Sequence, residues 1–344
     1  MKKVLAMVLA LMLLVSMTAC GSSSAPAATQ APATEAPATQ APATEAPATE
    51  APAATYNIGI CQLVQHPALD AATQGFRDAL TEKLGDQVVF DEQNAQGDSA
   101  TCSTIVTGFV ANSYDLIMAN ATPALLAAVS ATDTSPILGT SVTDFASALQ
   151  VEPDANGALG MNASGTSDGV PAQLYVDCLL ELVPDAKNVS ILYCSAEPNS
   201  VLQADQFIAA MGDKANCTVY TFADSNDIQA VVTSAIEGAD AVYIPTDNTA
   251  ASNMTIVANI CQPAGIPVIC GEEGMCSGGG LATVSISYYD IGYVCGEMAY
   301  DILANGADVS MMPVGYSENP VKKYNADYAA AIDFQIPDTY TAIE

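Results

Sequence analysis

Asp115-Leu116-Ile117-Met118, followed by Thr122-Pro123-Ala124, is matched further along the chain by Asp240-Ala241-Val242-Tyr243, followed by Thr249-Ala250. A second pair of stretches, Pro136-Ile137-Leu138-Gly139 and Pro267-Val268-Ile269-Cys270, repeats at a similar distance. The offsets are 125 residues, from 115 to 240, and 131 residues, from 136 to 267. A strand, turn and helix start that recur at a near-constant offset predict two similar α/β lobes in tandem. The alternative is coincidence, because any two strand-turn-helix units share hydrophobic and turn residues.

Short β-branched runs alternate with helical stretches through the rest of the chain. This alternation is typical of parallel sheets with crossover helices, and we expect an α/β fold. The expected strands are 57–61, 88–90, 116–119 and 137–139 in the first half and 189–193, 218–222, 241–244 and 268–270 in the second. The expected helices are 69–84, 100–111 and 124–131 in the first half and 169–182, 199–211, 227–237 and 250–263 in the second.

The N-terminus has the pattern of a bacterial lipoprotein export signal. Lys2 and Lys3 precede the apolar residues 4–15, and Met17-Thr18-Ala19 leads to Cys20. We expect a signal peptide over 1–19 and a lipid on Cys20 that anchors the protein to the extracytoplasmic face of the cell membrane. An uncleaved anchor is the alternative. Residues 21–55 repeat Ala-Pro-Ala-Thr-Gln or Ala-Pro-Ala-Thr-Glu, which cannot build a core, so we expect 20–55 to be the lipidated Cys20 followed by a disordered linker.

Charge excludes several kinds of partner. The formal net charge is −30, and apart from Lys2 and Lys3 the chain has only six Lys and Arg residues. Nucleic acid is therefore a poor partner, and no polybasic patch would bind anionic lipid. The 289 residues from 56 to 344 are too many for one ordinary core and favour two lobes.

The cysteine and histidine content argues against disulfides and metals. Nine cysteines besides Cys20 lie mostly in apolar runs, so we expect buried free thiols rather than disulfides. A single histidine, His66, and the lack of a CxxC pair argue against a metal site. We expect His66 to be structural, at the start of the first helix.

Loops at the carboxyl ends of the expected strands are where an α/β protein binds a ligand. Thr122-Pro123 and Asn199-Ser200 have the form of helix starts that could hold a carboxylate, or could merely cap their helices. Asp247-Asn248-Thr249 offers an acid for a ligand ammonium, with helix capping as the alternative. Asp144 and Glu272-Glu273 add acid at equivalent strand ends.

Catalytic motifs are missing from the sequence. We find no G-x-S-x-G elbow, no G-x-G-x-x-G or P-loop, and no second histidine to assist a cysteine nucleophile. We therefore expect a binding protein without a cofactor rather than an enzyme.

At these loops the chain resembles the extracytoplasmic solute-binding lipoproteins of ABC transporters of the tryptophan and tyrosine uptake type. The resemblance covers nearly all of 56–344. It is carried by six stretches in the same order, with residues 162–165 (Asn-Ala-Ser-Gly) departing from the more usual Asn-Val-Thr-Gly. The stretches are 58–70, 93–98, 121–124, 162–168, 197–200 and 247–249.

The resemblance implies two Rossmann-like lobes joined by three crossover strands, the type I periplasmic binding protein fold. Lobe 1 would comprise 56–165 and 288–311, and lobe 2 would comprise 166–287 and 312–344. The implied ligand is an amino acid, most often aromatic, and the implied partner is an ABC permease that receives it. Asp247 would bind the ammonium and Thr122, Asn199 and Ser200 the carboxylate. Other residues expected at the cleft are Gln62, Leu63, Asp144 and Asn248. We expect a monomer, and a surface sensor without a permease is the alternative function.

Overall fold

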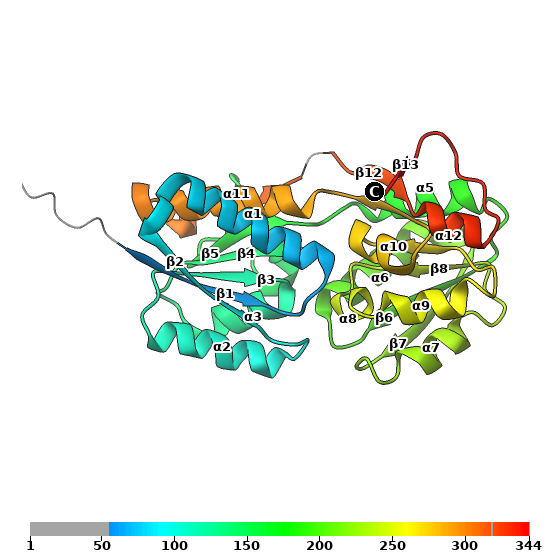
Figure 1. Ribbon diagram of the computed structural model, residues 1–344, viewed down its shortest axis with the longest axis horizontal. Coiled ribbons are helices and arrows are strands. Elements are labelled where there is room, and N and C mark those ends of the chain that lie inside the picture. Colours follow the sequence, from blue (N-terminus) through cyan, green and yellow to red (C-terminus); the bar gives the residue numbers. More distant parts are fainter. Residues whose placement is uncertain (1–54, 318, 344) are drawn as a thin grey trace, which may run out of the picture. The chain divides into compact units, whose positions relative to one another are not determined.

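The structure is a computed structural model that describes residues 55–317 and 319–343 (Figure 1). The expected signal peptide, Cys20 and nearly all of the linker lie outside these residues. The described part contains two mostly parallel sheets with helices on their faces, one in each half of the sequence. The predicted α/β class with two lobes is therefore confirmed.

The first sheet has the strand order β11-β5-β4-β3-β1-β2, and all its strand pairs are parallel. One face carries α1 and α11 side by side, and the other carries α2 and α3 (Figure 1). The strands are β1 (Tyr56–Gln62), β2 (Val88–Asn94), β3 (Leu116–Asn120), β4 (Ile137–Val142), β5 (Ala163–Ser167) and β11 (Gly315–Tyr316). The helices are α1 (Pro67–Leu84), α2 (Ser99–Ala111), α3 (Thr122–Ala131), α4 (Phe145–Leu149) and α11 (Tyr288–Asn305).

Glycine allows α1 and α11 to pack closely. A Cβ atom on Gly292 of α11 would lie 2.0 Å from the Ala72 carbonyl oxygen of α1, which no side chain could tolerate. Successive side chains of a strand point to opposite faces of the sheet, so the strands beneath these helices contribute apolar residues to the cores on both sides. Ile58 and Ile60 of β1 face α1 and α11, whereas Cys61 joins the core under α2.

The second sheet has the order β13-β12-β10-β9-β8-β6-β7, and only β12 runs antiparallel to its neighbour β10. Its strands are β6 (Asn188–Cys194), β7 (Asn216–Phe222), β8 (Ala241–Ile244), β9 (Val268–Cys270), β10 (Ala282–Ser285), β12 (Val321–Tyr324) and β13 (Thr341–Ala342). Its helices are α5 (Ala172–Leu182), α6 (Pro198–Met211), α7 (Ile228–Ala235), α8 (Asn248–Ala251), α9 (Met254–Cys261), α10 (Glu273–Gly279) and α12 (Ala326–Ala331). Short 3₁₀ helices span Gly85–Gln87, Gly212–Lys214 and Val309–Met311.

The internal repeat is confirmed by the topology. The order β4-β3-β1-β2 in the first sheet corresponds to β9-β8-β6-β7 in the second. One expected helix, 250–263, is wrong as a single element, because the chain leaves helical geometry at Asn253 and forms α8 and α9. The Asn253 side-chain amide donates to the Thr249 carbonyl, a local bond that competes with the helix.

The described residues cross between the sheets three times: after β5, between β10 and α11, and between β11 and β12. The expected lobe boundary at 165/166 lies inside β5, and the boundary at 311/312 lies before β11. Both strands pair in the first sheet, so by hydrogen bonding residues 166–167 and 315–316 go with lobe 1.

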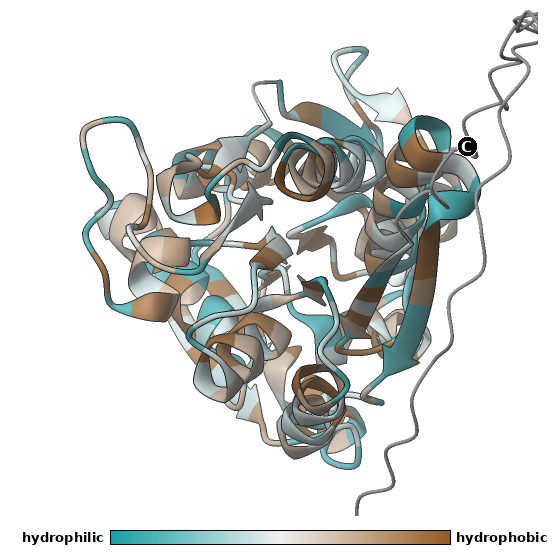
Figure 2. Cartoon of the chain, turned by 90° about the vertical axis from the view of Figure 1, so that its left-hand side faces the viewer, coloured by the Kyte–Doolittle hydropathy of each residue, from teal (hydrophilic) through white to brown (hydrophobic). Residues whose placement is uncertain are grey.

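The interior of both lobes is apolar, and hydrophobic segments in Figure 2 concentrate on strands and helices. The nine cysteines from 61 to 295 are free thiols, and all but Cys217 are buried. The expectation of buried free thiols is thus confirmed for the described residues. No helix within 55–317 or 319–343 is long and apolar enough to cross a membrane.

Candidate ligand-binding site between the two lobes

Buried polar side chains gather where the parallel strands end. These ends belong to β1, β3, β4 and β5 in lobe 1 and to β6, β8 and β9 in lobe 2. A polar side chain is buried at low cost only where it finds a partner. In lobe 1 they are Gln62, His66, Asn120, Thr122, Ser141, Thr143 and Asp168, and in lobe 2 they are Glu197, Asn199, Ser200, Thr246, Asp247, Asn248 and Glu272.

Three of the eight predicted ligand residues line one small cavity. Thr122 and Asp144 come from lobe 1 and Asn199 from lobe 2, and they enclose a volume of about 60 Å³. The remaining walls are Ser147, Ala148, Pro198 and Leu202. Residues 77 positions apart in sequence, from 122 to 199, meet here, so both lobes could contact one ligand in this cavity.

Thr122 does not cap its own helix. It is the first residue of α3, the preceding Ala121 has a φ of +93°, and no side chain caps this helix start. The Thr122 hydroxyl is buried and has no hydrogen-bond partner. Of the two functions that the sequence leaves open for Thr122, the geometry favours a hydroxyl available to a ligand.

Asn199 also presents a free polar atom. Its amide nitrogen donates to the Thr246 carbonyl over 2.8 Å, whereas its Oδ1 atom is buried without a partner. The free group is therefore an acceptor rather than a donor. Asp144 accepts a hydrogen bond from the Ser147 backbone amide over 2.9 Å and caps α4.

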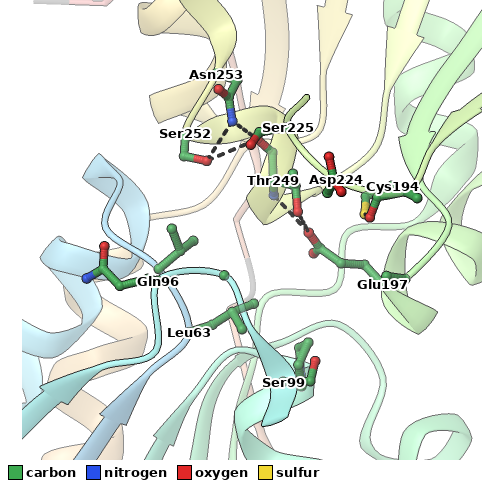
Figure 3. A pocket seen from close by; sticks show the side chains of 15 residues that line it. Leu63, Gln96, Ser99, Cys194, Glu197, Asp224, Ser225, Thr249, Ser252 and Asn253 are labelled. Carbon is green, nitrogen blue, oxygen red and sulfur yellow. Dashed lines mark hydrogen bonds between the residues drawn. The ribbon is translucent and has the colours of Figure 1, made fainter. Parts of the chain in front are cut away.

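Leu63 lines a second cavity, of about 150 Å³, shown in Figure 3. Leu63, Gln96 and Ser99 of lobe 1 face polar residues of lobe 2 across this space. The lobe 2 side includes Glu197, Asp224, Ser225, Thr249, Ser252 and Asn253.

Asp247 holds two structural elements together. Its Oδ2 atom accepts from the Cys194 amide and its Oδ1 atom from the Ala250 amide, each over 2.7 Å. The carboxylate thereby joins the end of β6 to the start of α8. Burial, with a further effect from the charge of Glu197, raises the pKa of Asp247 to about 8, and the buried Ser200 hydroxyl beside the same carboxylate acts in the opposite direction.

Gln62 belongs to the turn between β1 and α1. Its side-chain Oε1 atom accepts from the Thr73 hydroxyl over 2.6 Å, and its side-chain Nε2 atom donates to Asp70 Oδ1 over 2.7 Å and to the Val64 carbonyl over 3.0 Å. Gln62 thus fixes the loop that carries Leu63.

Glu197 is absent from the predicted ligand residues, yet it has more side-chain hydrogen bonds than Asp247. It accepts from the amides of Asn248 and Thr249, the Asn248 side chain and the Thr249 hydroxyl, over 2.7 to 3.0 Å. The signal that could have revealed it is an acid immediately before Pro198 at a helix start. Asn248 in turn accepts from His66 of lobe 1 over 3.1 Å.

A larger cavity, of about 580 Å³, lies beside the crossing segments. It is lined by the start of α1, by α10 and by residues near the crossings, and none of the predicted ligand residues lines it. Its charged groups include Glu272, which caps α10, and Glu273, which pairs with Lys323. Burial raises the pKa of Glu272 to about 7.

Two α/β lobes with facing strand ends and buried polar atoms between them define a binding protein for a small solute. Residues 57–342 match the family of ABC transporter substrate binding proteins, and the chain belongs to this family. It is 37% identical over 287 residues to the tyrosine-binding protein of Clostridioides difficile (strain R20291), covering 81% of each chain.

Solved structures agree with this family. An ABC domain in complex with L-Trp from Streptococcus pneumonia is 32% identical, with a TM-score of 0.79 over 84% of this chain and all of that one. The ligand-free, open structure of a substrate binding protein with adhesive properties from Clostridium difficile is 36% identical, with a TM-score of 0.64 over 84% of this chain and 99% of that one.

The chain is therefore an extracytoplasmic substrate-binding protein of an ABC transporter and not an enzyme. The type I periplasmic binding protein fold expected from the sequence is confirmed. The alternative of a surface sensor without a permease is not favoured, because the family, the tyrosine-binding relative and the solved structures all describe solute binding.

Proposed function

We propose that this substrate-binding protein captures an amino acid, preferably an aromatic one, and delivers it to an ABC permease while anchored through Cys20. The tyrosine-binding relative and the L-Trp complex support this ligand class, because both exceed 30% identity over most of the chain. The acidic composition and the scarcity of cations suit a ligand with an amine.

The observation that carries the proposal is a pair of buried, unpartnered atoms that line one cavity from opposite lobes. The Thr122 hydroxyl can donate to the ligand carboxylate, and Asn199 Oδ1 can accept from the ligand ammonium. The role of Asn199 differs from the carboxylate role expected from sequence, because its amide nitrogen is already bonded to Thr246. A ligand that pairs both atoms removes the cost of burying them alone.

Asp247 has a different role in this proposal from the one expected for it. Both of its oxygens accept backbone amides, so we assign it to positioning the loop that leads into α8. Ser200 and Gln62 support neighbouring loops in the same way, and Leu63 and Asp144 form walls.

Capture requires the lobes to separate and close again. A volume of 60 Å³ holds a few water molecules and is too small for an amino acid. The structure resembles the L-Trp complex (TM-score 0.79) more closely than it resembles the ligand-free, open structure (TM-score 0.64), although the open protein has the higher sequence identity to this chain. Hinge motion at the three crossings is the means of opening that the topology offers.

Isothermal titration of the full-length protein with each of the twenty amino acids tests the proposal. We expect heat with L-tyrosine or L-tryptophan and weaker heat, or none, with small aliphatic amino acids. If none of the twenty amino acids gives a heat of binding or raises the unfolding temperature, the proposed ligand class is refuted, while the family assignment remains intact.

A further inference from the structure

One direct hydrogen bond joins the two lobes away from the crossing segments. His66 Nε2, at the start of α1, lies 3.1 Å from Asn248 Oδ1, at the start of α8. Both side chains are buried, with 6% of each residue exposed. Within 55–317 and 319–343, every other hydrogen bond between residues far apart in sequence stays inside one lobe or within the crossings, and all four ion pairs stay inside a lobe.

The bond defines where the proton on His66 resides. The amide nitrogen of Asn248 donates to Glu197 Oε2 over 2.7 Å, which leaves Asn248 Oδ1 as an acceptor. His66 Nε2 must therefore carry a hydrogen and donate it. Its Nδ1 atom is then the unprotonated nitrogen of a neutral ring, and it is buried without a partner.

Protonation would place a second N–H on a nitrogen that has no acceptor. Burial lowers the pKa of His66 and outweighs the groups that favour the proton, which are the Asn248 acceptor, Glu197 before α6 and Asp70 on α1. Across from Pro67, α10 brings Glu272, which caps its own helix, and Glu273, which is paired with Lys323.

We propose that His66 and Asn248 form an interlobe latch that holds the capture conformation and releases it when His66 takes up a proton. Asn248 is fixed by Glu197, so the partner of His66 is already in position when the lobes meet. His66 in separated lobes faces water and takes up a proton near pH 6.5, whereas His66 in the latch resists protonation. Falling pH therefore shifts the equilibrium toward separated lobes.

The inference rests on the proposed function only in treating lobe closure as the capture step, and closure can be measured without a ligand. Small-angle X-ray scattering of the full-length protein from pH 8 to pH 5 reports lobe separation, and stopped-flow dilution with L-tyrosine reports release. We expect a larger radius of gyration and faster release at pH 5 than at pH 8.

Two variants separate the latch from general stability. Asn248→Ala should release L-tyrosine about five-fold faster at pH 8, the effect of one hydrogen bond of about 1 kcal/mol, and should still release it faster at pH 5, because His66 remains buried on closure. His66→Gln keeps an amide donor that does not titrate, so it should behave like the wild type at pH 8 and lose the pH dependence. Gln173→Ala, on the exposed face of α5, is the control and should match the wild type at every pH.

A His66→Gln protein that keeps the wild-type pH dependence would overturn the latch, as would an Asn248→Ala protein with wild-type scattering at pH 8. If L-tyrosine fails to bind any of these proteins, the ligand class fails, while the scattering series still decides the latch.

Discussion

The Tyr288 hydroxyl donates to Asp168 Oδ2 over 2.6 Å and thereby joins two of the three segments that cross between the lobes. Tyr288 begins α11 and Asp168 follows β5, and both side chains are buried. Asp168 Oδ1 has no partner, so the Tyr288 hydroxyl is the main hydrogen-bond donor to this side chain. Burial raises the pKa of Asp168.

Replacing Tyr288 with phenylalanine should destabilise the protein by about 1–3 kcal/mol, because the buried Asp168 would lose this donor. Urea unfolding at pH 7 measures the change. Tyr289→Phe is the matched control: its hydroxyl bonds to Asp78 at an exposed site, and the expected loss is under about 0.5 kcal/mol. Equal losses in the two variants would contradict a special role for the Tyr288 hydroxyl.

Replacing Thr122 with valine should weaken ligand binding without weakening the fold. The hydroxyl is buried and unpartnered, so its removal should leave the free energy of unfolding unchanged or slightly higher. The loss of a charge-assisted bond to the carboxylate should reduce affinity for L-tyrosine by about ten-fold or more, measured by isothermal titration.

Thr140→Val provides the opposite pattern as a control. The Thr140 hydroxyl is bonded to the Thr166 hydroxyl over 2.9 Å, so its loss should cost about 1 kcal/mol of stability and leave affinity nearly unchanged. Wild-type affinity in Thr122→Val would exclude the Thr122 hydroxyl from the site.

Glu197→Ala should cost about 2–4 kcal/mol, because two backbone amides at the start of α8 lose their acceptor. Thermal unfolding followed by circular dichroism measures the loss. Glu237→Ala, which removes an exposed acid, should change stability by less than about 0.5 kcal/mol. A Glu197→Ala protein as stable as Glu237→Ala would show that the hydrogen bonds of Glu197 add nothing to the stability of the fold.

Stability should decline as pH rises from 5 to 8. Burial raises the pKa of Asp247 to about 8 and that of Glu272 to about 7, whereas both groups titrate near 4 in the unfolded chain. The folded state therefore binds more protons than the unfolded state across this range, and the free energy of unfolding falls as they are lost. His66 acts in the opposite direction below its usual pKa of about 6.5, with a smaller expected effect than the two acids together.

Urea unfolding at pH 5, 6, 7 and 8 tests this slope. Glu272→Gln keeps an oxygen for the backbone amides of α10 but does not titrate, so its stability should depend less on pH than that of the wild type. Stability that increases from pH 5 to pH 8 would contradict the raised pKa values.

The strands that could be predicted are those with a continuous apolar run. The ranges 241–244 and 268–270 agree with β8 and β9 to the residue, because both strands are buried on both faces. Two other strands have no such signal: β5 reads Ala-Ser-Gly-Thr-Ser, and β12 contains Lys322 and Lys323. Their positions depend on pairing partners far away in sequence.

The same limit applies to the site. Thr122 could be singled out because a hydroxyl before proline marks a helix start, a local signal. The contact between His66 and Asn248 joins residues 182 positions apart, and only the packing of the two lobes brings them together. Sequence patterns therefore located the loops, while the bonds between them required the structure.

The buried free thiols can serve as probes of local opening in this protein. A thiol in the core reacts with an alkylating reagent only when the surrounding structure opens, so the rate at each cysteine reports the free energy of that opening. Cys61 and Cys102 sample lobe 1, whereas Cys261 and Cys270 sample lobe 2. Mass spectrometry could follow the reaction of these four thiols, and so the local opening of both lobes, within a single sample.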